Sequence, residues 1–365
     1  MEIEKLIRPD LAGFGGYVAN KSPEVMQVAR KIIKLDANEN PYGCSPRALK
    51  ALCNTRNWNI YPDADQTRLR ELLARYTGAD AGRIVAGNGS DEVLDEVLRL
   101  FLEPGDEVIN CVPAFDMYHL RTIINRGKVV DVPRDGDFAL KVAAVKGAIT
   151  PRTKLIIVAN PNAPTGNPTP REDLIELAGT GVPLLVDEAY YEFYGETVVD
   201  LVDKYENLMV LRTFSKWAGL AGLRIGYGIF PPEIAGYLMR IKSPYNVNSA
   251  AMTAAIESLN DIDYLMRNVK KIVAERERLF GELKNLDWLK PYPSQANFVL
   301  CKVLKGKASE IQQKLQSEGI IIRCIDQPPL LPNCLRIGVG KPEETDILLR
   351  RLREVEEKED GTENR

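Results

Sequence analysis

The stretch VLRTFSKWAGLAGLRIGYG, residues 210–228, is the most informative part of this chain. Val210 and Leu211 belong to an apolar run that predicts a strand, and Lys216 follows it closely. The neighbours of the lysine in sequence are large and apolar: Phe214, Trp217, Leu220 and Leu223. Desolvation by such neighbours lowers the pKa of an amine towards the range where it acts as a nucleophile or a base.

Hydroxyl and guanidinium groups lie on both sides of this lysine. Thr213, Ser215 and Arg224 indicate a small anion site beside it. A second interpretation is equally open from this stretch alone, in which Lys216 is a solvated loop residue and Arg224 a surface charge, because short motifs produce false matches. The rest of the chain has to decide between the two.

The composition indicates a folded protein with room for two domains. The chain has 365 residues, of which 45% are hydrophobic, with no long apolar run and a net charge of −3. Its Lys and Arg residues are scattered, so no binding to nucleic acid or to a membrane is expected. The N-terminal residues MEIEKLIRPD lack the basic flank and apolar centre of a secretion signal, which predicts a cytoplasmic location.

Cysteine and histidine usage limits the possible chemistry. His119 is the only histidine, so a histidine-rich metal site is excluded, and a serine or cysteine triad would have to use this one residue. The segment DMYHLRTII predicts that His119 is instead an ordinary side chain on a helix. The six cysteines are far apart in the sequence and form no C-x-x-C pair: Cys44, Cys53, Cys111, Cys301, Cys324 and Cys334. We therefore expect them to be free thiols that form neither a disulfide framework nor a zinc site.

Strands alternate with helices over much of the chain, which predicts an α/β fold with a largely parallel sheet covered on both faces. In such sheets ligands bind beyond the carboxyl ends of the strands. Five residues lie just past predicted strand ends, so we expect them to converge on one pocket: Gly89, Phe115, Asn162, Asp187 and Lys216.

The pattern divides the chain into three parts. Residues 1–30 are expected to form an arm, 31–245 a large domain and 246–365 a smaller α+β domain. Residues 233–259 and 263–286 are predicted as long helices, and 320–326 as a single strand.

A glycine-rich turn precedes the predicted helix that begins near residue 90. Ser90 and Asp91 are suitable N-cap residues, and the free N–H groups of the first turn favour an anion. The turn matches neither the dinucleotide nor the P-loop motif. Gly87 and Gly89 could also serve the tight turn alone.

Pyridoxal 5'-phosphate (PLP) needs the groups that this chain supplies in order: a lysine, a carboxylate for the ring nitrogen, a phenol or amide for the ring hydroxyl, an aromatic ring and a phosphate cup. The segments NPNAPTG, DEAYYEF and TFSK, followed by Arg224, resemble those of the fold-type I PLP-dependent aminotransferases, which have the aspartate aminotransferase-like fold. LDANENPYG and AGLAGLRIGYG are similar to the histidinol-phosphate aminotransferase branch. The resemblance spans roughly Tyr17 to Gly340.

This resemblance implies roles at the cofactor ring. Lys216 would hold the cofactor covalently and later move a proton between the substrate's α-carbon and the cofactor. Asp187 would pair with the ring nitrogen, Tyr190 would bond the ring hydroxyl, and Phe115 would stack on the ring. The family's asparagine before Pro-Thr-Gly is Ala163 here, so Asn162 takes over its bond or Tyr190 acts alone.

The resemblance also implies a phosphate cup and a second subunit. The cup would consist of Gly89, Ser90, Asp91, Thr213 or Ser215, and Arg224. Tyr61 matches a tyrosine that reaches this phosphate from the neighbouring subunit, which implies a homodimer.

For substrates, the resemblance implies L-histidinol phosphate as amino donor and 2-oxoglutarate as acceptor, which becomes L-glutamate. Arg336 and Arg323 are the candidates for binding these anions, with Tyr17 and Asn40 closing the pocket. Arg323 could equally be a surface charge on a strand. Asn38, Glu39 and Asn297 match family positions without an assigned role.

Three alternatives remain open. A threonine-phosphate decarboxylase or an aminotransferase for aromatic or branched amino acids would use the same scaffold. A cofactor-sensing regulator or a non-catalytic binding module is the third, although the chain has no spare length or basic helix for a DNA-binding domain.

Overall fold

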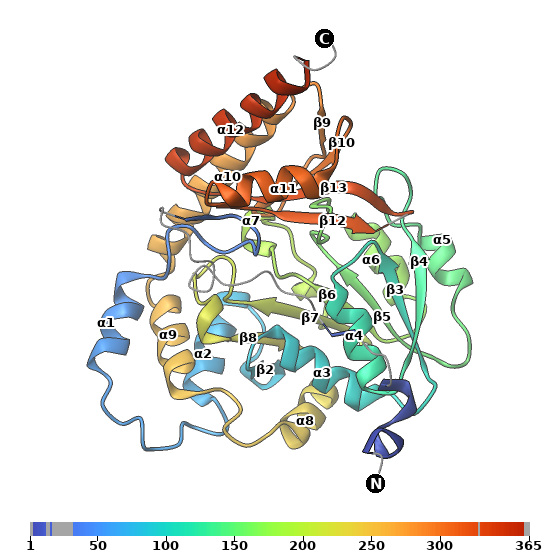
Figure 1. The fold of residues 1–365 in the computed structure, drawn as a ribbon. Coiled ribbons are helices and arrows are strands. Elements are labelled where there is room, and N and C mark those ends of the chain that lie inside the picture. Colours follow the sequence, from blue (N-terminus) through green and yellow to red (C-terminus); the bar gives the residue numbers. More distant parts are fainter. Residues whose placement is uncertain (1–2, 12–14, 17–31, 328, 361–365) are drawn as a thin grey trace.

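The computed structural model describes residues 3–11, 15–16, 32–327 and 329–360 (Figure 1). A seven-stranded sheet forms the centre of its larger part. Its strands in chain order are β2 (Ile84–Gly87), β3 (Glu107–Val112), β4 (Lys128–Pro133), β5 (Thr153–Ala159), β6 (Leu184–Asp187), β7 (Leu208–Thr213) and β8 (Gly226–Ile229). They are arranged in the order β2-β8-β7-β6-β5-β3-β4, and β8 pairs antiparallel with both neighbours. The predicted α/β fold with a largely parallel sheet is confirmed.

The central strands are apolar on both faces because helices cover both. In β5, Leu155 and Ile157 pack into one hydrophobic cluster, whereas Ile156 and Val158 pack into another on the opposite face. This is the alternation that the strand pleat produces. The sheet is therefore buried between two helical layers, and only its edges and strand ends are open to ligands.

One layer consists of α3 (Ser90–Phe101), α4 (Asp116–Ile124) and α8 (Pro232–Ile241). The other cluster contains residues of α1 (Pro46–Asn54), α2 (Thr67–Thr77), α5 (Val142–Gly147), α6 (Arg171–Ala178), α7 (Tyr191–Tyr194), α9 (Ser249–Leu259) and α10 (Ile262–Leu283). It extends into the smaller part of the protein, where α11 (Ala308–Ser317) and α12 (Pro342–Asp360) also contribute. Among the helices in the described ranges, none has the length and apolar character needed to cross a membrane.

A second, antiparallel sheet lies above the first in Figure 1, next to α10, α11 (Ala308–Ser317) and α12 (Pro342–Asp360). It has the order β12-β13-β10-β9 and consists of β9 (Leu289–Pro291), β10 (Phe298–Val303), β12 (Arg323–Gln327) and β13 (Leu331–Gly338). Short β1 (Ile33–Lys34) pairs in parallel with β11 (Ile320–Ile321) and so links the N-terminal segment to this part. The predicted strand 320–326 is therefore two strands, separated at Ile322, with different partners.

The region predicted as one long helix, residues 233–259, is also interrupted. It forms α8 and α9, because the segment between them contains Pro244 and places Tyr245 at a φ of 58°. Neither residue continues a helix in that geometry. Asn248 then caps α9 by accepting a hydrogen bond from the N–H of Ala251 (2.8 Å). α9 packs against α1 and α2, and the predicted domain boundary at residues 245 and 246 stays a prediction.

Candidate active site

A cavity of about 470 Å³ lies at the carboxyl ends of β5, β6 and β7, where Ala159, Asp187 and Thr213 contribute to its wall. The predicted convergence at the strand ends is thus observed for Phe115, Asp187 and Lys216, which all line this cavity. Its remaining polar lining comes from Asn38, Glu39, Ser90, Asp91, Tyr118, Tyr190, Thr213, Ser215, Arg224 and Arg336.

Lys216 lies in the loop after β7 and is partly buried, with Phe214 and Trp217 fully buried on either side of it. Its Nζ donates a hydrogen bond to the carbonyl oxygen of Ala37 (2.8 Å). Desolvation, together with the positive charge of Arg336, lowers the pKa of the Lys216 amine to about 8. A substantial fraction of the amine is therefore neutral near physiological pH, as a nucleophile or base requires.

Asp187 ends β6 and is 7% exposed. Its two oxygens accept different hydrogen bonds: Oδ1 from the N–H of Ala189 (2.9 Å) and Oδ2 from the hydroxyl of Tyr118 (2.6 Å). Burial raises the pKa of the Asp187 carboxyl to about 6, and the two hydrogen bonds oppose this rise. The carboxylate is thus ionised at neutral pH but close to its titration range.

Two hydrogen bonds that link three residues position the phenol of Tyr190. Asn38 donates from Nδ2 to the Tyr190 hydroxyl (2.9 Å), and Asn297 donates from Nδ2 to the carbonyl oxygen of Asn38 (2.8 Å). All three are buried. Three segments therefore meet at this phenol: the one after β1, the turn after β6 and the start of β10. Asn38 and Asn297, which had no assigned role from the sequence, thus have a structural one.

The anion cup forms where α3 begins beside the loop that carries Arg224. Gly89, with a φ of 82°, is the N-cap of α3, and no side chain caps this helix. This corrects the expectation that Ser90 and Asp91 are the capping residues; they are the first two residues of the helix, so their N–H groups belong to its uncapped first turn. Arg224 lies next to Gly89 and donates from Nη2 to Oδ2 of Asp91 (2.8 Å).

Gly226 allows this cup to form. A Cβ atom on Gly226 would lie 2.3 Å from the backbone nitrogen of Ser90 and 2.8 Å from the carbonyl carbon of Gly89. Only glycine lets β8 approach the start of α3 so closely. Thr213 and Ser215, both buried, complete the cup from the end of β7.

Phe115 and Arg336 lie on the boundary between the main cavity and an adjoining one of about 210 Å³. Arg323 also lines the adjoining cavity, because it pairs in register with Arg336 across β12 and β13. Arg336 donates from Nη2 to the carbonyl oxygen of Asp36 (2.6 Å). Two arginine side chains thus line the small cavity beside the main one and give it positive charge.

Four predicted residues do not line the main cavity: Gly89 at the start of α3, Arg323 in the adjoining cavity, Asn162 and Asn40. Asn162 is fully buried in the turn after β5, where its Nδ2 donates to the carbonyl oxygen of Pro113 (2.9 Å) and to the hydroxyl of Thr165 (2.7 Å). Ala163 takes the place at the cavity wall instead. Asn40 donates from Nδ2 to the carbonyl oxygen of Trp217 (2.7 Å) and lines a separate cavity of about 250 Å³. The Asn40 side chain thus holds the loop that carries Lys216 without lining the main cavity.

Two others lie apart from the cavity for different reasons. Tyr61 is 77% exposed and its ring stacks on Tyr245 at a centroid distance of 4.4 Å. Tyr17, with most of the predicted arm, lies outside the described residues. His119, in turn, is exposed on α4 as an ordinary surface side chain.

The sequence reasoning did not identify Tyr118. Residues three apart lie on the same side of a helix, so the spacing of Phe115 and Tyr118 at the start of α4 predicts a contact between their rings. The two rings do meet edge to face, at a centroid distance of 5.7 Å. The contact with Asp187, 69 residues away in the chain, has no such local pattern.

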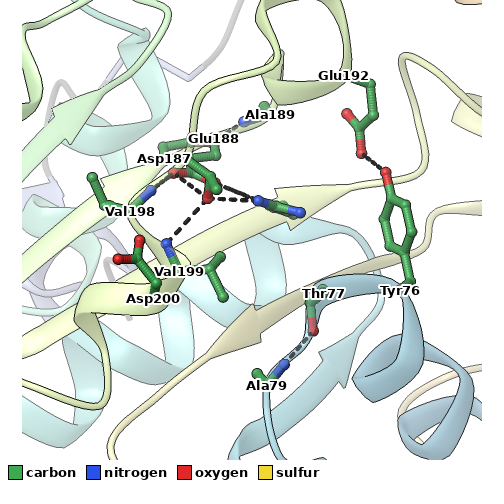
Figure 2. A network of polar contacts seen from close by, with 12 residues as sticks. Tyr76, Thr77, Ala79, Asp187, Glu188, Ala189, Glu192, Val198, Val199 and Asp200 are labelled. Carbon is green, nitrogen blue, oxygen red and sulfur yellow. Dashed lines mark hydrogen bonds and ion pairs between the residues drawn. The ribbon is translucent and has the colours of Figure 1, made fainter.

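A buried polar network supports the site from behind (Figure 2). Glu188, next to Asp187, accepts a hydrogen bond from the N–H of Val198 (2.8 Å) and forms an ion pair with Arg212 (2.8 Å). Both charged side chains of this pair are almost fully buried. In the same network the hydroxyl of Tyr76 donates to Glu192 (3.0 Å). The bonds of Glu188 hold the turn that follows β6, and with it Asp187.

The fold and the site define an enzyme of the α/β class in which a partly desolvated lysine faces a buried carboxylate and an anion cup at the carboxyl edge of the sheet. A family model described as aminotransferase class I and II matches residues 30–352. The chain belongs to this family.

Relatives and solved structures are similar over nearly the whole chain. A histidinol-phosphate aminotransferase of Dehalococcoides mccartyi is 55% identical over 97% of this chain and 99% of its own. Histidinol-phosphate aminotransferase 1, chloroplastic, of Arabidopsis thaliana is 42% identical over 96% of this chain and 86% of its own. The crystal structure of histidinol-phosphate aminotransferase from Sinorhizobium meliloti in complex with pyridoxal-5'-phosphate has a TM-score of 0.86, with 29% identity, 96% of this chain covered and 98% of the other.

Proposed function

We propose that this protein is a histidinol-phosphate aminotransferase, which transfers the amino group of L-histidinol phosphate to 2-oxoglutarate in histidine biosynthesis. The products are 3-(imidazol-4-yl)-2-oxopropyl phosphate and L-glutamate. The observation that carries the proposal is the 55% identity to a histidinol-phosphate aminotransferase across almost the full length of both chains. The cytoplasmic location expected from the N-terminal sequence stays a prediction.

The cofactor is pyridoxal 5'-phosphate, and the residues of the cavity fit it. The cup at the start of α3 offers an uncapped helix N-terminus, hydroxyl groups and Arg224 to a phosphate. The carboxylate of Asp187, the phenol of Tyr190 and the ring of Phe115 line the same cavity. When bound, PLP supplies an aldehyde for the amine and a conjugated ring that withdraws electrons from the α-carbon.

Lys216 is the residue that we assign to bind the aldehyde and then to carry the proton from the substrate's α-carbon. Its lowered amine pKa, about 8, suits both tasks near neutral pH. Asp187 would hold a proton at the ring nitrogen through its negative charge. Tyr190, held by Asn38, offers its hydroxyl to the ring oxygen. This arrangement leaves Asn162 without a role at the ring.

Arg336 and Arg323 are the residues that we assign to the anionic end of the substrates. Since both guanidinium groups line the cavity adjoining the main one, they can receive a phosphate ester and, in the second half of the reaction, a carboxylate. A guanidinium fork matches either anion, which explains how one site serves two substrates.

The experiment that separates this function from its alternatives is a pair of assays on the purified protein. L-Glutamate formation is followed with L-histidinol phosphate and 2-oxoglutarate, and CO₂ release is followed with L-threonine phosphate. We expect the first reaction and not the second. Substitution of the donor by aromatic amino acids should lower kcat/KM strongly, because the adjoining cavity then lacks its phosphate. Equal rates with an aromatic amino acid and with L-histidinol phosphate would favour an aromatic aminotransferase. Release of CO₂ from L-threonine phosphate would favour the decarboxylase.

We further propose that the protein acts as a homodimer in which Tyr61 serves the partner's cofactor phosphate. Tyr61 does not line the main cavity of its own chain; it lines a surface groove that also contains Trp58, Ile60 and Tyr245. These four side chains are each more than 40% exposed. A contiguous apolar surface of this kind is typical of an interface between proteins, and a second copy of the chain is the partner that would bring Tyr61 to a cup.

A further inference from the structure

We propose that Tyr118 is a positioning residue that keeps the Asp187 carboxylate ionised and fixed in orientation for the ring nitrogen of the cofactor. This inference rests on the proposed use of PLP, and it concerns a side chain that no motif in the sequence indicates. Tyr118 acts through Asp187 and is therefore distinct from the groups assigned to the reaction itself.

The geometry at Asp187 supports this role. The Tyr118 hydroxyl lies 2.6 Å from Oδ2 of Asp187, which is short for a hydroxyl donor and typical of a bond to a charged acceptor. Because Oδ1 is already bonded to the N–H of Ala189, the carboxylate is held at both oxygens. Its plane cannot rotate without the loss of one of these bonds.

Tyr118 is itself held firmly. It is 2% exposed, in the first turn of α4, and its N–H donates to the carbonyl oxygen of Phe115 (3.1 Å). The Thr122 hydroxyl donates to the carbonyl oxygen of Tyr118 (2.7 Å). The ring of Tyr118 packs edge to face on that of Phe115. A donor on a rigid element imposes its position on the acceptor, whereas a mobile one would not.

The charge balance shows why a donor is needed. Asp187 is buried, and Asp91 and Glu188 act on it with like charge, so all three effects favour its neutral form. Lys216, Arg336 and Tyr190 line the same cavity, and Arg212 forms its ion pair with Glu188. Among the side chains of the described residues, that of Tyr118 donates a hydrogen bond to this carboxylate. Burial and the nearby carboxylate raise the pKa of the Tyr118 phenol well above its usual value, so it stays a donor.

The test is Tyr118→Phe, which removes the hydroxyl and leaves the ring. The probe is pyridoxamine 5'-phosphate, whose amine cannot be captured by Lys216, titrated into the cofactor-free protein between pH 5 and 9 and followed by fluorescence. We expect the pH at which affinity falls to move upward on the order of one pH unit in the variant, because a carboxylate that loses a hydrogen bond protonates at higher pH. The phosphate of the probe titrates in the same range in both proteins, so the difference between the profiles is the measured quantity.

Tyr76→Phe is the matched control, since it also removes a phenol bonded to a buried carboxylate, that of Glu192, outside the cavity. Its profile should equal that of the wild type. In an Asp187→Asn background, Tyr118→Phe should leave the affinity unchanged within about twofold, because the titrating partner is gone. An unshifted profile for Tyr118→Phe, an equal shift in Tyr76→Phe, or a full further loss in the Asp187→Asn background would overturn the inference. None of these readouts depends on the amino donor, so they are separate from a failure of the proposed substrate.

Discussion

The side chains of Lys216 and Asp187 share one cavity, and burial moves their pKa values towards each other. The amine falls to about 8 and the carboxyl rises to about 6, so near pH 7 the carboxylate is charged while the amine is partly neutral. The same physical cause, desolvation, therefore prepares a base and an anion in the wall of one cavity. The second contribution at Lys216 is the charge of Arg336.

The contribution of Arg336 to Lys216 gives a prediction that needs no substrate. In the cofactor-free protein, covalent capture of PLP by Lys216 should accelerate as pH rises through about 8, because the neutral amine is the nucleophile. Arg336→Gln should move this midpoint to higher pH, since the positive charge that disfavours the ammonium form is removed. Stopped-flow absorbance measures the rates. Arg323→Gln is the control, and an equal shift in both variants would show that the effect is not specific to Arg336.

At the scale of elements, the site depends on how closely β8 approaches the start of α3. β8 pairs antiparallel in an otherwise parallel sheet, and the glycine at residue 226 lets its backbone touch the Gly89–Ser90 turn. The turn after β6 is fixed separately, by the buried ion pair of Glu188 and Arg212. The close approach of β8 shapes the proposed phosphate cup, whereas the ion pair orients the Asp187 carboxylate.

Gly226→Ala should therefore damage the cup more than the fold. The added Cβ would lie 2.3 Å from the nitrogen of Ser90, so the first turn of α3 has to move away from the phosphate. We expect the Kd for PLP to rise at least about tenfold, the loss of roughly one good hydrogen bond to a charged group. Gly222→Ala is the control, because a Cβ there meets nothing within 4 Å. Equal PLP affinity in the two variants would contradict the role of the close approach.

Glu188→Ala should destabilise the protein strongly. It leaves the guanidinium of Arg212, 2% exposed, without its ion-pair partner, and such losses cost about 3–5 kcal/mol in the free energy of unfolding. Urea unfolding of the cofactor-free protein measures it. The double variant Glu188→Leu/Arg212→Met should lose less than Glu188→Ala alone, because no unpaired charge stays buried. A loss below about 1 kcal/mol for the single variant would show that the pair is not a structural support.

These elements also show which features a sequence can predict. Asp187 ends one buried strand and Lys216 follows another, so the sheet topology alone places them at one edge. β8 escaped prediction because its glycines leave no apolar alternation. The orientation of Asn162 depends on a turn that directs its amide to Pro113, and Tyr118 depends on a partner across 69 residues. Position along a strand is a local property, whereas side-chain direction and long-range partners are set by the assembled fold.

At the scale of the whole molecule, the two sheets meet around the cavity, and the proposed dimer completes it. Arg336 on β13 reaches the cavity from the antiparallel sheet, whereas Lys216 and Asp187 come from the parallel one. Tyr61 is exposed on a different surface. A change in the position of the smaller sheet would therefore move Arg336 relative to Lys216 and Asp187, and dissociation of the proposed dimer would remove Tyr61 from the partner's site.

A complementation experiment tests the shared site. Lys216→Ala and Tyr61→Ala subunits should each be poorly active alone, but refolded together they should recover about a quarter of wild-type activity, since half of the dimers are hybrids with one complete site. Light scattering verifies the dimer in each sample. Activity no higher than the mean of the two parents would contradict a tyrosine that serves the partner.

The most direct test of the central claim is a single-turnover measurement. The PLP-loaded protein is mixed with L-histidinol phosphate without an acceptor, and the ketone product is quantified. We predict about one equivalent of 3-(imidazol-4-yl)-2-oxopropyl phosphate per subunit, and none from Lys216→Ala, which should still bind PLP without a covalent bond. A full equivalent from the Lys216→Ala variant, or no ketone from the wild-type protein, would contradict the account.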